Sequence, residues 1–381
     1  MGLNLERKNQ LQRTSLIDTT VYDGEMMFNQ LRKKETYKNL VNQITENLQN
    51  SKDSKFTFEL NGTQYDITVS LPDETKGINI PSMLMMPRNC KQHTNIVLES
   101  NNMESSDLHE IISQAGQTGM HLTSVLKNNP RPILIPILPS EENRPYFQQL
   151  SQECFNLSEK DKYYRIDKQI VRILEKTKEQ INQNYGINCE DKILLNGYSS
   201  SGVFAQRFSM IHPEIIKKAC IGGASGSIPL LDATLDYPIG IKNYRELFGK
   251  DFDMEEYKKI QFEYYVGELE TINKSNDRRL ENGELAPMHD MSYFDRSVPI
   301  NVGIHQRKLL GYDMFERVQR TISKLKEKGV HINHQILKSR THRNMEVNGT
   351  QYKGVNELGD KIIDDTFGIS REKTENKEII D

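Results

Sequence analysis

Residues 192–204 read KILLNGYSSSGVF, and this stretch decides the fold of the chain. A short apolar run at 193–195 is followed at once by a tight turn of small residues at 197–202. Apolar residues then recur at helical spacing, which predicts a helix over 202–211. A strand, a sharp turn and a helix in this order are the setting of a nucleophile elbow, which holds a serine hydroxyl clear of the sheet.

The candidate nucleophile in this turn is Ser199. Gly197 stands two residues before it and Ser201 two residues after it, so the pattern is G-x-S-x-S rather than G-x-S-x-G. Small residues are needed at both places because the strand and the helix approach closely around the turn. The alternative is an ordinary Gly/Ser-rich loop, and the strand before the turn and the helix after it favour the elbow.

The composition limits the class of protein. The 381 residues suffice for a large core and suggest roughly two domains by length, although α/β enzymes often use such lengths for one domain with insertions. The formal net charge of -3 makes nucleic acid an unfavoured partner. The four cysteines form no C-x-x-C pair, so no metal site of the usual spacing is expected, and scattered cysteines suit a reducing compartment.

Neither a signal peptide nor a membrane span is expected. The first residues mix charged and amide side chains without an apolar stretch of the kind that a secretory signal needs. No run of about 18 apolar residues occurs anywhere, so no transmembrane helix and no membrane partner are predicted. These observations predict a soluble, cytoplasmic protein.

The chain divides into three predicted parts. Residues 1–54 are polar and carry a partial helical stripe, which predicts a helical extension packed on the main domain; the same segment equally suits an oligomer contact, such as that of a homodimer. Residues 55–369 form the main domain. Residues 370–381 are charged and are predicted to be a disordered tail.

The main domain is predicted to be α/β. Residues 56–71 alternate around Asn61-Gly62, which favours a type I′ turn and therefore a hairpin. After residue 95, strands alternate with helices, which predicts a mostly parallel central sheet with helices on both faces. Two long connections, 224–258 and 272–311, are predicted lid segments. The other predicted strands are 82–86, 96–98, 132–138, 192–196, 219–222, 261–266 and 332–337, and the other predicted helices are 107–115, 166–185, 312–328 and 354–366.

The candidate acid follows a strand. A serine hydroxyl needs a base, and the base needs an orienting acid. In the α/β-hydrolase arrangement these come in the chain order serine, then Asp or Glu, then histidine. The strand at 261–266 runs into Gly-Glu-Leu-Glu-Thr, where Glu270 is the favoured acid and Glu268 the alternative. For each of them, the competing interpretation is an exposed loop carboxylate.

The candidate base is His342, one of nine histidines. It follows the last predicted strand, as the chain order requires, and the competing interpretation is a surface-loop histidine. His212 is expected to shape the turn after the elbow helix. The remaining histidines are unsuited by their place before the serine, in a predicted lid or in the last strand: His93, His109, His121, His289, His305, His331 and His334.

An oxyanion needs two backbone N–H donors aimed where charge develops. One is expected from Ser200, the residue after the nucleophile. The other is expected from Asn101 or Asn102, which follow the predicted strand 96–98, although an ordinary asparagine turn is the competing interpretation. No phosphate-binding glycine motif and no H-E-x-x-H motif occurs, so neither a cofactor nor a metal is predicted.

Several segments together resemble the bacterial α/β-hydrolases related to polyhydroxyalkanoate depolymerases and feruloyl-type esterases. The resemblance runs from about residue 95 to residue 345 and rests on VLESNN, RPILIPILP, RIDKQIVRILEKT, NGYSSSGVFAQRFSMIHPE, GGASG, DYPIGIKNYRELFGKDFD and YYVGELETIN. Members of this family carry G-[FY]-S-A-S-G at the elbow, so Ser201 is usual there and Ser200 replaces alanine. They carry aspartate where this chain has Glu270.

The motifs and the resemblance together imply a serine hydrolase of one α/β-hydrolase domain. It would cleave an ester or related acyl bond in a small molecule or a polymer through an acyl-enzyme, with Ser199, His342 and Glu270 as its triad and without a cofactor. A peptidase or a thioesterase with the same triad is one alternative. A catalytically silent fold used for binding or regulation is another, motivated by glutamate in place of aspartate and by the segment 1–54.

Overall fold

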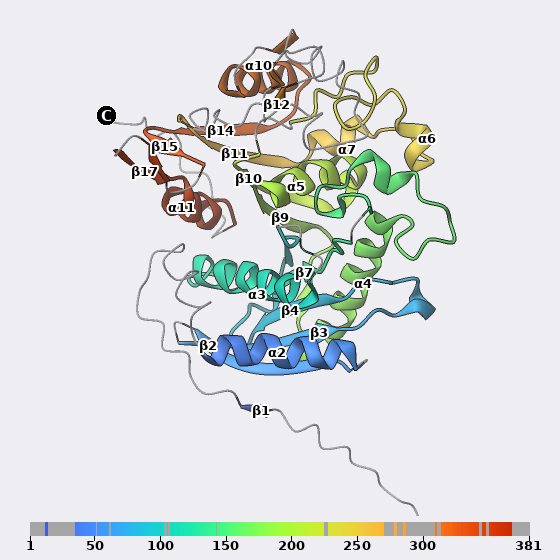
Figure 1. Cartoon of the computed structure of the whole chain (residues 1–381), viewed down its shortest axis with the longest axis vertical. Coiled ribbons are helices and arrows are strands. Elements are labelled where there is room, and N and C mark those ends of the chain that lie inside the picture. The colour runs from blue at the N-terminus through green and yellow to red at the C-terminus, as the bar shows by residue number, and fades with distance from the viewer. Residues whose placement is uncertain are drawn as a thin grey trace, which may run out of the picture.

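A ten-stranded sheet forms the centre of the molecule (Figure 1). The computed structural model describes residues 12–13, 35–50, 52–60, 62–102, 105, 107–141, 143–224, 228–269, 278–279, 285–286, 309–310, 314–342, 345–347 and 350–367. The strands of the sheet, in their spatial order, are β1 (Gln12–Arg13), β2 (Ser54–Leu60), β3 (Thr63–Ser70), β4 (Ser82–Pro87), β7 (Ile133–Pro136), β6 (Val97–Leu98), β9 (Ile193–Tyr198), β10 (Ile216–Gly222), β11 (Gln261–Gly267) and β14 (Ile332–Leu337).

The sheet has an antiparallel part and a parallel part. Strands β2, β3, β4 and β7 pair antiparallel with one another. From β7 through β6, β9, β10 and β11 to β14, every neighbouring pair is parallel. The carboxyl ends of these parallel strands therefore meet at one edge, which is where open α/β sheets bind their ligands.

Helices cover both faces of the sheet. Helices α2 (Glu35–Gln49), α3 (Leu108–Val125) and α11 (Asn356–Phe367) pack into one apolar core, and helices α4 (Ile166–Tyr185), α5 (Ser200–Ile211) and α10 (Met314–Glu327) pack into the other (Figure 1). A mostly parallel sheet between two helical layers confirms the predicted fold class.

The two cores follow from the alternation of side chains along each strand. In β9, Ile193 and Leu195 belong to the core beneath α4 and α5, whereas Leu194 belongs to the core beneath α2 and α3. Successive side chains of a strand point to opposite faces, so a parallel strand covered on both sides must be apolar throughout. This explains why the run at 193–195 contains no polar residue.

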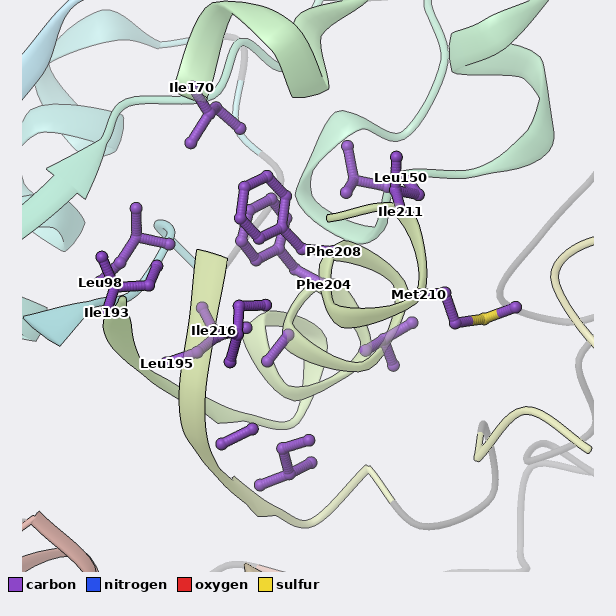
Figure 2. Packing of buried hydrophobic residues seen from close by; sticks show 14 of the residues in the cluster. Leu98, Leu150, Ile170, Ile193, Leu195, Phe204, Phe208, Met210, Ile211 and Ile216 are labelled. Carbon is purple, nitrogen blue, oxygen red and sulfur yellow. The ribbon is translucent and has the colours of Figure 1, made fainter. Parts of the chain in front are cut away.

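Two aromatic rings fix α5 to the sheet. Phe204 and Phe208 lie one helical turn apart, are fully buried and stack with ring centroids 5.3 Å apart. Figure 2 shows them in the same cluster as Leu98, Ile193 and Leu195 from β6 and β9. The turn between β9 and α5 is therefore held between two elements that pack tightly against each other.

The predicted elements differ from the structure mainly at their ends. The helix at 166–185 and the strand at 332–337 have the predicted bounds. Helix α3 runs to Val125, whereas the prediction ended at residue 115. The prediction was too short because the polar residues Gln114 and Gln117, which are buried, interrupt the apolar pattern that it followed. Short strands outside the central sheet have no sequence signal and were not predicted: β5 (His93–Thr94), β8 (Asn188–Cys189), β15 (Arg340–Thr341), β16 (Met345–Val347) and β17 (Thr350–Gly354).

Helix α2, from the segment 1–54, packs against α3. At this contact the Tyr37 hydroxyl donates to the backbone oxygen of Ser113, and Asn42 Oδ1 lies 2.8 Å from His109 Nε2. Among the described helices, none has both the length and the low polarity that crossing a bilayer requires.

Two tyrosines of the first predicted lid, 224–258, belong to the core. Tyr237 and Tyr244 are buried in the same cluster as α5, and their hydroxyls donate to the backbone oxygens of Leu150 and Met210. The second predicted lid, 272–311, lies almost wholly outside the described residues, and the tail at 370–381 lies outside them entirely.

A buried ionic cluster joins the start of α4 to the end of α5. Asp167 Oδ2 accepts a hydrogen bond from Arg165 Nη2 at 2.6 Å and lies 3.0 Å from His212 Nε2. Burial opposes ionisation of Asp167, but the hydrogen bonds from Arg165 and His212 outweigh it and lower the pKa of this carboxyl. The cluster therefore stabilises the folded state while Asp167 is ionised.

Replacing Asp167 by asparagine should lower the free energy of unfolding by about 3–5 kcal/mol near neutral pH, because the buried Arg165 loses its counter-charge. The folded-state pKa of Asp167 is depressed, so its contribution is present above the unfolded value of about 3.9 and is lost as the pH falls below it. Urea unfolding of both proteins should therefore show the difference shrinking below about pH 4. Asp251→Asn, which removes an exposed partner of Arg245, is the control and should leave stability unchanged; equal losses in the two variants would contradict the prediction.

Candidate active site

Ser199 occupies the sharp turn between β9 and α5 with φ 57° and ψ -116°. A positive φ is uncommon for a residue with a side chain, and it marks local strain. The turn is held on both sides, since the Ser199 N–H donates to Gly222 O at 2.9 Å and the Ser199 carbonyl accepts from the Val203 N–H at 3.0 Å. The backbone thus has the form of a nucleophile elbow at the carboxyl end of the sheet.

The close approach of strand and helix falls on two glycines. A Cβ atom at Gly197 would lie 2.2 Å from the backbone oxygen of Ser201, and one at Gly202 would lie 2.7 Å from Ala224 Cβ. The need for a small residue before the nucleophile is thus met at Gly197. After the nucleophile, the glycine that the packing requires stands at 202, so a side chain at position 201 is compatible with the turn.

His342 comes from the chain after β14, the edge strand of the parallel part of the sheet, and its side chain contacts Ser199. Its Nε2 lies 3.1 Å from Ser199 Oγ, and it follows β15, directly after β14. The imidazole stacks on the ring of Tyr198 with centroids 5.0 Å apart, and the Tyr198 hydroxyl donates to the backbone oxygen of His342. A base within hydrogen-bond reach of a hydroxyl can remove its proton, so this pair can generate a nucleophile.

Gly223 lies directly against the imidazole. A Cβ atom at this position would lie 2.7 Å from His342 Cε1 and 2.9 Å from His342 Nδ1. Gly223 also has φ +57°, a conformation that favours glycine. The histidine ring is therefore held between Tyr198 and the backbone that follows β10.

Of the two candidate acids, the structure describes Glu268 but not Glu270. Glu268 Oε2 accepts a hydrogen bond from the Ser339 N–H at 2.9 Å, so this carboxylate supports the turn after β14. The next residue, Leu269, donates its N–H to Arg340 O at 2.8 Å, which places the chain leaving β11 beside the segment that leads to His342. Glu270 lies outside the described residues.

The residues 99–102 after β6, called the asparagine loop below, are tied to two neighbours. Asn101 Oδ1 accepts from the Leu138 N–H at 2.7 Å, and Asn101 Nδ2 donates to Leu138 O at 3.2 Å. Asn102 Oδ1 accepts from the Ser201 N–H at 2.9 Å. The segments expected to supply the two oxyanion donors, this loop and the start of α5 at Ser200, are thus bonded to each other.

Two residues near the turn were not predicted. The Tyr146 hydroxyl lies 2.9 Å from Ser200 Oγ, next to the nucleophile. Tyr146 comes from irregular chain after β7, where the sequence has no signal. Glu99 is 6% exposed, and its carboxyl accepts from Ser201 Oγ at 2.8 Å and from Asn196 Nδ2 at 2.7 Å. An acidic residue directly after a buried strand was the signal that could have identified it.

The arrangement has the parts that acyl transfer needs: a serine on a strained turn, a base at its hydroxyl, and nearby backbone N–H groups. Among the described residues, no group of three or more His, Cys, Asp or Glu side chains is placed to hold a metal ion. With its mostly parallel sheet and its elbow at the carboxyl end of β9, the chain has the α/β-hydrolase fold.

Comparison with known proteins finds distant likenesses. No family model and no curated protein matches the chain. A thermostable esterase is similar over 75% of this chain and 54% of its own, with 14% identity and a TM-score of 0.35, so this chain spans about half of that esterase. An S-formylglutathione hydrolase from Agrobacterium tumefaciens is similar over 81% and 95%, with 13% identity and a TM-score of 0.40. A ferulic acid esterase is similar over 72% and 90%, with 10% identity and a TM-score of 0.36.

Replacing Gly223 by alanine should displace the His342 ring and slow the labelling of Ser199 by a fluorophosphonate, a reagent for activated serines. A displacement of about 1 Å can cost roughly 100-fold in rate. Gly249→Ala is a matched control, because Gly249 also has a positive φ, +71°, but no atom lies within 4 Å of a Cβ there. Equal labelling rates for the two variants would show that Gly223 does not position the histidine.

Proposed function

We propose that the chain is a serine hydrolase that cleaves an ester or related acyl bond. The observation that carries this proposal is the 3.1 Å contact between Ser199 Oγ and His342 Nε2, on a turn whose backbone is strained at the serine. A serine hydroxyl becomes an effective nucleophile when an adjacent base accepts its proton. The contact favours an active enzyme over a silent binding fold.

The proposed reaction has two halves. His342 takes the proton from Ser199 as the hydroxyl attacks the carbonyl carbon, and it then gives this proton to the leaving alcohol, which yields an acyl-enzyme. Water then attacks the acyl-enzyme while His342 takes one of its protons. The bond between the acyl carbon and Ser199 Oγ breaks, His342 returns the proton to Ser199 Oγ, and the acid is released. In both halves the N–H of Ser200 and the N–H of Asn101 or Asn102 would stabilise the negative oxygen of the tetrahedral intermediate.

We propose Glu270 as the acid that orients His342. The bond between Leu269 N–H and Arg340 O supports it, because it brings the residue before Glu270 next to Arg340, two residues before His342. The engagement of Glu268 with the Ser339 N–H also favours Glu270 over Glu268. A glutamate is one methylene longer than the aspartate that the resembling family carries, so its backbone would lie farther from the imidazole for the same contact.

The proposed substrate is a small-molecule or polymeric ester. The resemblance to polyhydroxyalkanoate depolymerases and feruloyl-type esterases supports this class, and it rests on the sequence motifs from about residue 95 to residue 345. A peptidase or a thioesterase with the same triad is separated from an esterase by assaying the purified protein on peptide, thioester and oxygen-ester substrates side by side. We also propose a cytoplasmic location and no nucleic acid partner.

Replacing Ser199 by alanine should reduce the hydrolysis of a short-chain aryl ester to background, because removal of a triad nucleophile costs on the order of 10⁴-fold or more. Ser209→Ala is the control: this serine lies on the same helix, and its hydroxyl donates only to Ala205 O within that helix among the described contacts. Fluorophosphonate labelling of the wild-type protein, read by mass spectrometry, should modify Ser199. Undiminished turnover by folded Ser199→Ala protein would refute the assignment.

The acid is identified by a pair of amide substitutions. Glu270→Gln should lower kcat by roughly 10³- to 10⁴-fold, because an amide cannot stabilise the imidazolium that forms during attack. Glu268→Gln should retain most of the activity, since an amide oxygen can still accept from the Ser339 N–H. The reverse result, with the larger loss in Glu268→Gln, would move the role to Glu268.

A further inference from the structure

Ser201, two residues after the nucleophile, contacts a buried carboxyl group that has no basic side chain among its described hydrogen-bond partners. Glu99 directly follows β6 and is 6% exposed, and its two oxygens accept from Ser201 Oγ in α5 and from Asn196 Nδ2 in β9. Burial raises the pKa of Glu99, and the hydrogen bonds from Asn196 and Ser201 oppose that rise. A buried carboxyl is costly compared with an apolar side chain of similar volume, so packing alone does not explain its presence.

Ser201 connects this carboxyl to both sides of the candidate site. Its hydroxyl accepts from the Tyr198 N–H at 2.9 Å, and its single proton faces two acceptors, Glu99 Oε1 at 2.8 Å and Tyr198 O at 3.0 Å. Its own N–H donates to Asn102 Oδ1 at 2.9 Å. A glycine at position 201, as in G-x-S-x-G, would keep the bond to Asn102 but lose all three contacts of the hydroxyl.

The contacts continue to the base. Tyr198, whose N–H is held by Ser201, stacks on the His342 ring and donates its hydroxyl to the His342 backbone oxygen. On the other side, the asparagine loop that begins with Glu99 supplies one proposed oxyanion donor. One serine hydroxyl and one carboxyl thus join the elements that carry the nucleophile, the base and the oxyanion site.

We propose that Glu99 and Ser201 form a positioning bridge, which sets the asparagine loop and Tyr198 against the elbow so that the oxyanion donors and His342 meet the same reacting carbonyl. Neither residue touches the reacting atoms, so both act through others. The inference rests on the proposed hydrolase function. Ser201 stands where G-x-S-x-G has its second glycine. The proposal gives this serine a role in positioning the groups of the site, not only in packing.

A structural role alone would lower stability and leave kcat of the folded variant unchanged. A positioning role predicts a lower kcat in the folded variant as well. Glu99→Met removes the acceptor of Asn196 Nδ2 and of Ser201 Oγ, so it should lower the free energy of unfolding, and its kinetics are measured under conditions where the variant stays folded. The same variant should lower kcat for an aryl ester by about 10- to 100-fold with KM nearly unchanged, because displaced groups stabilise the transition state less well. Ser201→Ala, which removes the hydroxyl from the other end, should give the same loss.

Two further variants test whether the residues act as one unit. The double variant of Glu99→Met and Ser201→Ala should be no slower than the slower single variant, since the bridge can be broken only once. Glu99→Gln should recover most of the activity, because its amide can still accept from Ser201. Among the described residues Asn196 Oδ1 has no hydrogen-bond partner, so a rotated Asn196 amide can accept from the new glutamine.

The experiment is steady-state kinetics of these variants beside urea unfolding and fluorophosphonate labelling, with Ser209→Ala as the control on the same helix. Unchanged kcat in Glu99→Met and Ser201→Ala, or losses that multiply in the double variant, would overturn the bridge. A wild-type protein that fails to label at Ser199 would instead refute the proposed function. A wild-type protein that labels normally, with variants equal to it, would refute the bridge alone.

Discussion

The positive φ of Ser199 is the constraint on which the rest of the site depends. A backbone conformation of this kind costs on the order of 1–3 kcal/mol, so it persists only where the surroundings leave the chain no alternative. Gly197 allows β9 and α5 to come close, Gly202 allows α5 to approach Ala224 after β10, and the buried rings of Phe204 and Phe208 fix α5 to the sheet. The apolar core, more than the polar groups of the site, therefore maintains the strained turn.

The polar groups of the site lie at the carboxyl ends of different strands and contact one another across the sheet. Glu99 follows β6, Ser199 follows β9, Gly223 follows β10 and His342 comes after β14. Parallel strands bring all of these ends to one edge of the sheet. Ser201 joins two of these strand ends, since it contacts Tyr198 in β9 and both Glu99 and Asn102 in the asparagine loop after β6.

Much of the fold and part of the site were predictable from the sequence, because short local patterns of residues specify them. The elbow, helix α4 and strand β14 follow from short apolar patterns and from turn residues that lie within a few positions of each other. The required glycine at 202 was not evident, because only the packed helix shows that Ala224 approaches there. Tyr146 and Glu99 were missed for a related reason: their roles depend on partners more than fifty residues away, Ser200 and Ser201. Glu270 lies outside the described residues and stays a prediction.

The contact between Ser199 and His342 joins positions 143 residues apart, and that between Glu99 and Ser201 joins positions 102 apart. Contacts of such separation form slowly, because the loops between them must first be closed at an entropic cost. The contact between Ser199 and His342 therefore requires β9, β10, β11 and β14 to be in register, whereas that between Glu99 and Ser201 requires only β6 and β9. Recovery of serine reactivity during refolding would consequently report assembly of the sheet from β9 to β14, whereas a helix signal such as that of α4 would report local structure.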